Sequence, residues 1–255
     1  MAITSRDSDL TLDEKKAIKY CINNGNIVFD IGGYHGEWTA SVLDLRPECY
    51  VHIFEPFNFG LPKIKKSFIN DKVFSNTFCI SDSLGFSYFW RYEHPPLSTM
   101  YKRNAGVIKG LGFFNPPQRV VIIKMSLDEY CKSKNIKYID FLKIDTEGSE
   151  FDILKGASNL LSEKGINYIQ FEYGGTYQDS NITLEEIFLY LKGKGYIIGK
   201  LATKGVDFIC QFSPEMEDYI YCNYLAIIKD KKIFHIQFDA VKDGMQDNDE
   251  LEKIM

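Results

Sequence analysis

Acidic side chains recur at the ends of short apolar runs that we expect to form the buried strands of this 255-residue chain. Ligands of parallel α/β sheets bind beyond the carboxyl ends of the strands, where such residues come together. Carboxylates in that position can receive an ammonium group or a hydroxyl, take up a proton, or hold a divalent cation. The residues at these strand ends are Asp30, Glu55, Ser81 with Asp82, Asp145 with Glu147, and Glu172.

The first of these acids opens a glycine-rich segment, FDIGGYHG, which contains Gly32, Gly33 and Gly36. A dinucleotide site would favour the pattern GxGxxG, whose first glycine falls at Ile31 here. Asp30 would also stand where phosphates need positive potential. An NAD-dependent oxidoreductase is therefore disfavoured. The glycines alone are equally compatible with a tight turn between a strand and a helix.

A ligand with a cationic amino-acid head suits this segment better. The Asp30 carboxylate can receive an ammonium group through charge-assisted hydrogen bonds, and Gly32, Gly33 and Gly36 let a ligand approach the main chain. Glu55 follows Gly36 by 19 residues, at the end of the next strand, and is placed to accept both hydroxyls of a ribose. S-adenosylmethionine carries both groups, so we expect it to be the cofactor.

Catalysis is assigned to Asp145, His94 and Glu172. As a general base, His94 or Asp145 could take a proton from a bound hydroxyl. Asp145 and Glu172 could instead hold Mg²⁺ or Mn²⁺, which lowers the pKa of a bound hydroxyl. We also place Asp145 on the rim that binds the cofactor.

Three neighbouring charged residues have simpler interpretations. Glu147 and Glu150 could simply be acids at the expected N-terminus of a helix, where they favour the helix dipole, rather than functional acids of the rim. Lys143 is expected to pair with an acid or to point to the other face of the sheet.

Apolar runs alternate with segments of helical periodicity, which predicts βα units and a mostly parallel sheet. A capping box of Thr11 and Glu14 begins the first helix. The main strands are expected at 26–31, 50–55, 73–81, 140–145, 168–172, 196–198 and 224–228, with further short runs at 85–92 and 120–124. Later helices are expected from Ser126, at 151–161 and at 184–191.

No linker divides the chain, so a single domain over residues 1–255 is predicted, with its core at about 12–230. The segment 93–119 holds four of the eight prolines and is expected to be a long irregular loop that contacts the acceptor. The polar tail at 239–255 is expected to be loosely ordered.

The composition excludes several classes of protein. Thirty Lys and Arg against 35 Asp and Glu give a net charge of −5, which argues against a nucleic-acid partner. The six cysteines form no CxxC pair, so neither a zinc knuckle nor a redox motif is present. No run of 18 apolar residues occurs, and we expect a cytoplasmic protein without a membrane span. The oligomeric state is left open, a homodimer included.

Several motifs together resemble the FkbM family of S-adenosylmethionine-dependent methyltransferases, over roughly residues 20–200. The glycine segment is shared by many class I methyltransferases, whereas KIDTEGSE followed by a helix ending in LKGA is specific to the family. The motifs are FDIGGYHGEWT, IFEP, CISDSLG, SLDEYC and DFLKIDTEGSEFDILKGA.

The resemblance implies a Rossmann-like α/β fold: a sheet of seven mostly parallel strands with flanking helices and a last antiparallel strand. It also implies methyl transfer to a hydroxyl oxygen. Its cofactor positions correspond to Asp30, Gly32, Gly36 and Glu55, and its adenine-side position to Ser81 and Asp82. The acceptor is expected to be a small molecule, namely a nucleotide-linked sugar or a glycan sugar of surface polysaccharide biosynthesis. A natural product and a non-catalytic cofactor-binding module are the alternatives.

Overall fold

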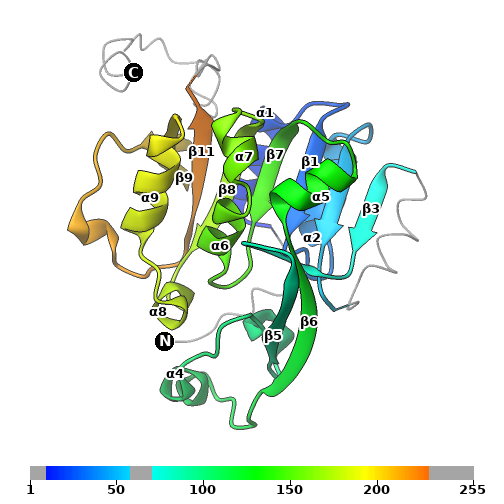
Figure 1. The fold of residues 1–255 in the computed structure, drawn as a ribbon. Coiled ribbons are helices and arrows are strands. Elements are labelled where there is room, and N and C mark those ends of the chain that lie inside the picture. Colours follow the sequence, from blue (N-terminus) through cyan, green and yellow to red (C-terminus); the bar gives the residue numbers. More distant parts are fainter. Residues whose placement is uncertain (1–9, 58–70, 230–255) are drawn as a thin grey trace.

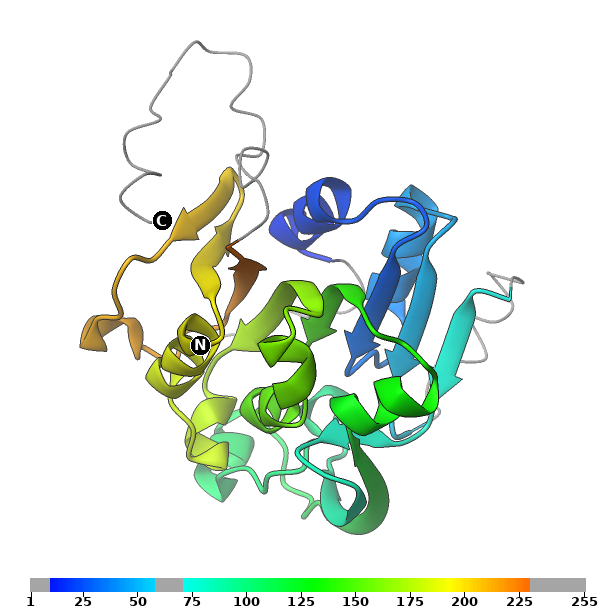
Figure 2. The same ribbon diagram turned by 45° about the horizontal axis from the view of Figure 1, so that its top comes forward.

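The computed structural model describes residues 10–57 and 71–229. Its centre is an eight-stranded sheet with helices on both faces (Figures 1 and 2). In spatial order the strands are β10 (Gly205–Phe208), β9 (Tyr196–Ala202), β11 (Cys222–Ile228), β8 (Ile166–Tyr173), β7 (Ile139–Ile144), β1 (Ile27–Ile31), β2 (Tyr50–Phe54) and β3 (Val73–Asn76).

Seven of these strands are the predicted ones. Strands β3, β2, β1, β7 and β8 run parallel, and β11 is inserted antiparallel between β8 and β9. The central strands are buried along almost their whole length because helices cover both faces, which explains their nearly continuous apolar sequences. An eighth strand, β10, was not predicted; it pairs antiparallel with the edge of β9.

The helices form two layers, each packed over its own hydrophobic core. One core lies beneath α1 (Leu12–Cys21) and α2 (Glu37–Leu45). The other lies beneath α5 (Leu127–Ser133), α6 (Glu150–Lys155), α7 (Ser158–Ser162), α8 (Thr176–Ser180) and α9 (Leu184–Gly193). The predicted capping box of Thr11 and Glu14 is present.

The prediction of one strand over 73–81 was wrong. The Asn76 amide donates to the carbonyls of Ile53 and Phe74, and the chain leaves the main sheet after it. Residues 79–81 then form β4 (Cys79–Ser81) of a second sheet, with the order β4, β6 (Gln118–Ser126), β5 (Gly85–Arg91). This second sheet projects from one end of the molecule (Figure 1).

The single helix predicted at 151–161 is two helices, α6 and α7. They are separated at Gly156, where a Cβ would lie 2.0 Å from the carbonyl oxygen of Ser81. The chain bends where β4 passes directly against it.

The segment 93–119 is more ordered than predicted. It contains η1 (Pro95–Leu97), α4 (Ala105–Gly110), which Asn104 caps, and the first residues of β6. A short 3₁₀ helix, η2 (Pro214–Met216), precedes β11. Within the described ranges, no helix has the length and apolar character needed to cross a membrane. The tail at 239–255 lies outside the described residues.

Candidate active site

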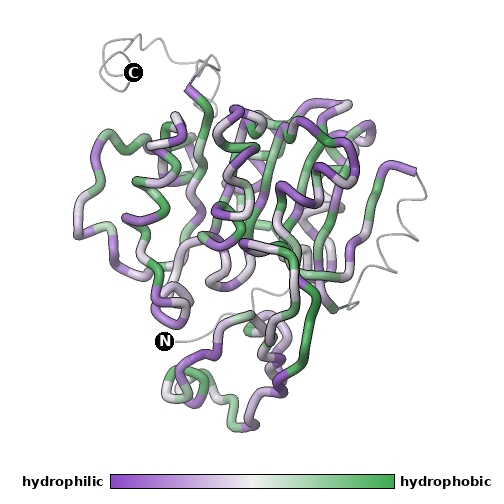
Figure 3. Tube along the Cα trace, viewed as in Figure 1, coloured by the Kyte–Doolittle hydropathy of each residue, from purple (hydrophilic) through white to green (hydrophobic). Residues whose placement is uncertain are grey.

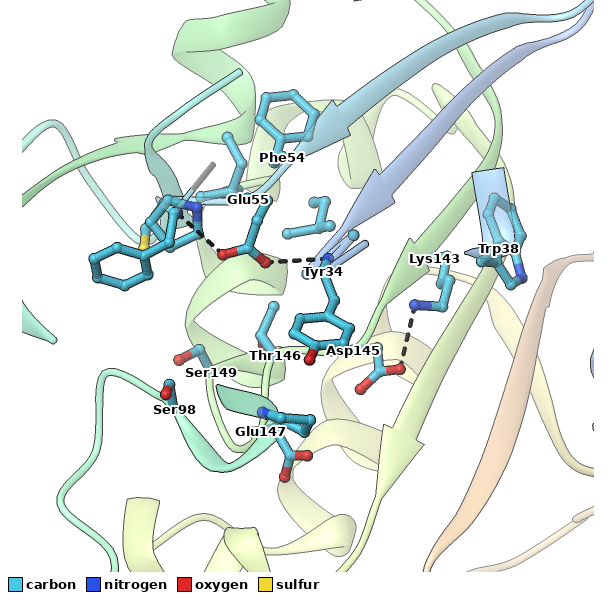
Figure 4. A pocket seen from close by; sticks show the side chains of 18 of the residues that line it. Tyr34, Trp38, Phe54, Glu55, Ser98, Lys143, Asp145, Thr146, Glu147 and Ser149 are labelled. Atoms are coloured by element: carbon cyan, nitrogen blue, oxygen red, sulfur yellow. Dashed lines mark hydrogen bonds and ion pairs between the residues drawn. The ribbon is translucent and has the colours of Figure 1, made fainter. Parts of the chain in front are cut away.

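A cavity of about 400 Å³ opens at the carboxyl ends of β1, β2, β7 and β8. Its walls include the strand ends, the glycine segment after β1, residues 78–80 at β4, and residues of the segment 89–100 that begins in β5. Figure 4 shows Tyr34 projecting into this space near the carboxylates of Glu55 and Asp145. The acids that were predicted to share a rim therefore do meet, with the exceptions described below.

The glycine segment is pressed against two neighbouring strands. The amides of Gly32 and Gly33 both donate to the carbonyl of Phe54, at 3.0 and 3.1 Å. Gly32 has a φ of +81°, and a Cβ there would lie 1.8 Å from the carbonyl oxygen of Asp145. Both glycines line the cavity, whereas Gly36 begins α2 outside it. The first two glycines therefore bring bare main chain to the cavity wall.

Glu55 lines the cavity at the end of β2 and is buried. Its two carboxylate oxygens accept hydrogen bonds of 3.1 Å from the amides of Tyr34 and Phe57. Burial nevertheless raises the pKa of Glu55 to about 7, because the two amides offset only part of the desolvation cost. Lone pairs not used by these amides can face a ligand in the cavity.

Asp30 is fully buried and does not line the cavity. One of its oxygens accepts from the Thr39 hydroxyl at 2.7 Å, and the other lies 3.5 Å from the ammonium of Lys143. The same ammonium lies 3.2 Å from the carboxylate of Asp145, and both Lys143 and Asp145 line the cavity. Lys143 therefore pairs with acids, as one of its two interpretations held, and it separates Asp30 from the ligand space.

Three carboxylates gather on the far side of the cavity. Ligand oxygens of Asp145, Glu147 and Glu172 lie within 4.8 Å of one another. Burial, followed by repulsion from Asp145 and Glu147, raises the pKa of Glu172 well above its usual value. Glu172 makes no ion pair within the described residues.

Of the two interpretations of Glu147, a helix N-terminal acid or a member of the acidic rim, the structure supports the second, because its carboxylate belongs to this cluster. It has a φ of +60°, in the left-handed region, within the loop that follows β7. Arg103 holds its carboxylate at 2.8 Å, and the Thr99 hydroxyl donates to its carbonyl at 2.8 Å. The segment 93–119 thus docks on the loop that carries the acids. In the sequence, the glycine that follows Glu147 in the Thr-Glu-Gly part of KIDTEGSE could have indicated a turn at this place.

Glu150 begins α6 as predicted and also closes the preceding loop. It accepts hydrogen bonds of 2.8 to 2.9 Å from the amide and hydroxyl of Thr146 and from the amide of Gly148. Burial raises its pKa to about 7. Its function here is to hold the loop that presents Asp145 and Glu147.

Besides Asp30 and Gly36, three more predicted site residues lie outside the cavity. Ser81 is buried, and Asp82 forms an ion pair with Lys124. His94 stacks on Phe113, with ring centroids 5.2 Å apart. In place of Ser81 and Asp82, the side of the cavity formed by β4 is lined by Cys79 and Ile80, with Phe78 before them.

Polar atoms without a partner also mark the cavity. Within the described ranges, Trp38 Nε1, His35 Nδ1 and Ser149 Oγ are buried without a hydrogen bond, and all three residues line the cavity. Buried polar groups normally have a hydrogen-bond partner, so these atoms fit a polar ligand that would form the missing hydrogen bonds.

Comparison with known proteins identifies the family. A family model described as the methyltransferase FkbM domain matches residues 30–198, more than half of the chain. The chain belongs to the FkbM methyltransferase family. The family resemblance seen in the sequence is thereby confirmed, as is the predicted Rossmann-like α/β fold with its late antiparallel strand.

Solved structures resemble this FkbM-family protein in fold only. They include methyltransferase FkbM from Methylobacillus flagellatus (17% identity, TM-score 0.48), which aligns with 80% of this chain but over only 44% of its own length. Precorrin-6y C5,15-methyltransferase from Geobacter metallireducens shows 12% identity and a TM-score of 0.46, with 88% of this chain and 92% of that chain covered. TrmK from M. capricolum, in complex with S-adenosylhomocysteine, shows 16% identity and a TM-score of 0.44, with 87% and 70% covered. No curated protein sequence matches the chain.

Proposed function

We propose that this protein transfers the methyl group of S-adenosylmethionine to a hydroxyl oxygen of a sugar, nucleotide-linked or within a glycan, in surface polysaccharide biosynthesis. Membership of the FkbM family supports methyl transfer. The observation that favours a hydroxyl acceptor is the cluster of Asp145, Glu147 and Glu172, because a hydroxyl must lose its proton as the new bond forms.

The residues of the cavity fit the cofactor. Glu55 would accept the ribose hydroxyls, and the bare main chain of Gly32 and Gly33 leaves room for the ligand. Lys143 and Asp145 offer a cation and an anion side by side, which suits the carboxylate and ammonium of an amino-acid head. Asp30 would act through Lys143 rather than by direct contact.

S-adenosylmethionine supplies an activated methyl group on a sulfonium. The protein must hold the acceptor oxygen in line with that carbon and receive the hydroxyl proton. Glu172 is our candidate base, because it lines the cavity without an ion pair among the described residues, and its raised pKa makes its carboxylate form a stronger proton acceptor than an ordinary carboxylate. Asp145 and Glu147 are each already paired with an internal cation, Lys143 and Arg103 respectively.

Two other routes for the proton are distinguishable from this one. His94 would need to leave its stack on Phe113 to reach the cavity. A divalent ion such as Mg²⁺ or Mn²⁺ has three oxygen ligands within reach in Asp145, Glu147 and Glu172. It would compete with Lys143 and Arg103 for two of them.

The test uses labelled S-adenosylmethionine with a panel of nucleotide sugars, with and without EDTA. Glu172→Gln should keep cofactor affinity while turnover falls by about 10² or more, whereas Glu163→Gln, at an exposed carboxylate, should leave both unchanged. Full activity in EDTA refutes the metal, and loss of activity that Mg²⁺ restores supports it. Label that appears only on protein or RNA refutes the small acceptor.

Two alternatives to the sugar acceptor are decided by the same assay. Transfer to a natural product but to no sugar moves the proposal to that substrate class. Tight cofactor binding with no transfer to any acceptor indicates a binding module.

A further inference from the structure

The hairpin of β5 and β6 exposes an apolar face. Phe86 lies opposite Ile123 and Tyr88 lies opposite Val121 in the register of the two strands, so all four side chains share one side. All four are exposed, Phe86 by 76% and Val121 by 65%. Figure 3 shows β6 as a strongly hydrophobic stretch at the projecting end of the molecule.

The same end carries further apolar side chains and most of its charge is positive. Phe114 and Val107, near α4, are exposed as well. Residues 85–124 contain six Lys or Arg and one acid, Glu93, although acids outnumber bases in the whole chain. The exposed bases of this segment include Lys102, Lys109 and Arg119.

Two of these cations sit directly at the apolar face. The Arg119 guanidinium lies 4.3 Å from the centroid of the Tyr88 ring, and the Lys102 ammonium lies 5.1 Å from that of Trp90. Aromatic and aliphatic side chains with a rim of Lys and Arg are typical of surfaces that lie at the interface of an anionic bilayer.

We propose that this surface, made of Phe86, Tyr88, Val121 and Ile123 with the rim of Lys102, Lys109 and Arg119, docks the protein on anionic phospholipid membranes. The opposite face of the hairpin packs Phe89 and Ile122 in a small core with Cys79, and Phe89 lines the cavity. A bilayer on the outer face therefore lies one sheet away from the proposed acceptor site. Docking itself needs neither cofactor nor turnover, so it can be tested apart from the proposed function.

Two other occupants fit the observations less well. A second copy of the chain, paired through a twofold axis, would bring the like charges of Arg119 and Lys102 together. A nucleic acid would need many phosphate contacts, whereas the centre of this surface is aliphatic as much as aromatic.

The test is co-sedimentation with vesicles of phosphatidylglycerol and phosphatidylcholine, against vesicles of phosphatidylcholine alone. The protein should bind the first and not the second. Phe86→Ser with Ile123→Thr should weaken binding at least about tenfold, because each large apolar side chain contributes about this factor when buried. Lys109→Gln with Arg119→Gln should weaken it by about fivefold per charge removed.

Controls come from the other end of the fold. Leu189→Ser removes an exposed leucine of α9, and Lys132→Gln removes an exposed lysine of α5; both should bind vesicles like the wild type. Cofactor affinity and circular dichroism show that each variant is folded. No binding of the wild type to anionic vesicles overturns the proposal. Two other results also overturn it: a wild-type dimer that the Phe86→Ser, Ile123→Thr variant abolishes, and binding of single-stranded RNA in place of vesicles.

Discussion

Ionisation of Glu55 should couple cofactor binding to pH. Burial raises the pKa of this carboxyl from 4.5 to about 7, and only the carboxylate form can accept from both ribose hydroxyls. With a pKa of about 7, the ionised fraction rises about tenfold between pH 6 and pH 8, so the dissociation constant of the cofactor should fall by about the same factor.

The stability of the cofactor-free protein should change in the opposite direction. Because the folded pKa lies above the unfolded one, protonated Glu55 stabilises the fold. That contribution is complete below pH 4.5 and is lost as the pH rises through 7. Linkage gives a loss of about 1.4 kcal/mol between pH 6 and pH 8 from this single group.

The assays are calorimetric titration with S-adenosylhomocysteine and urea denaturation, each at pH 6 and pH 8. Glu55→Gln should bind S-adenosylhomocysteine more weakly, and its affinity should not show the tenfold change with pH. Between pH 6 and pH 8, its free energy of unfolding should fall by about 1.4 kcal/mol less than that of the wild type. Glu150, whose pKa is also about 7, is present in both proteins, so their difference isolates Glu55. Glu163→Gln is the control for a lost surface charge. If the pH dependence of binding is the same in Glu55→Gln as in the wild type, Glu55 does not bind the ribose.

Three further substitutions test the support of the site. Gly32→Ala should destabilise the fold by about 3 kcal/mol or more in thermal unfolding, because the new Cβ would lie 1.8 Å from the Asp145 carbonyl oxygen. The control is Gly193→Ala, whose Cβ would have no neighbour within 4 Å and should leave the stability unchanged. Arg103→Met should lower the free energy of unfolding by about 3–5 kcal/mol, because it leaves Glu147 without its cation. The segment 93–119 should then be cut by limited proteolysis, whereas the control Arg119→Met should show neither effect. Glu150→Ala removes three hydrogen bonds from the loop after β7 and should lower turnover and the melting temperature together; unchanged turnover would show that this loop needs no such support.

The meeting of the acids could be predicted because it follows from the direction of the strands. Parallel strands end at one edge of a sheet, so Glu55, Asp145 and Glu172 had to approach one another once β2, β7 and β8 were placed correctly. The same reasoning failed for Ser81 and Asp82. Their strand belongs to a different sheet, and its departure after Asn76 depends on hydrogen bonds to neighbouring chain that no local pattern expresses.

The partner of Glu147 could not be predicted, since it comes from a distant part of the chain. Arg103 reaches Glu147 across 44 residues, from a segment whose prolines indicated only irregular structure. The positive φ of Glu147 arises in a loop held by Glu150 and Thr99. Periodicity identifies helices and strands, but such contacts exist only after they have packed.

Lys143 shows how the buried acid and the cavity acids depend on each other. A fully buried carboxylate such as Asp30 is costly without a cation, and a lysine buried in a central strand is costly without an anion. With one ammonium between Asp30 and Asp145, each acid lowers the cost of burying the lysine, and both raise its pKa. Lys143 therefore stays charged at the cavity wall. Its ion pair with Asp30 also links β1, which leads into the glycine segment, to β7, which leads into Asp145. A charged group that the fold itself requires is thereby available to a zwitterionic ligand head.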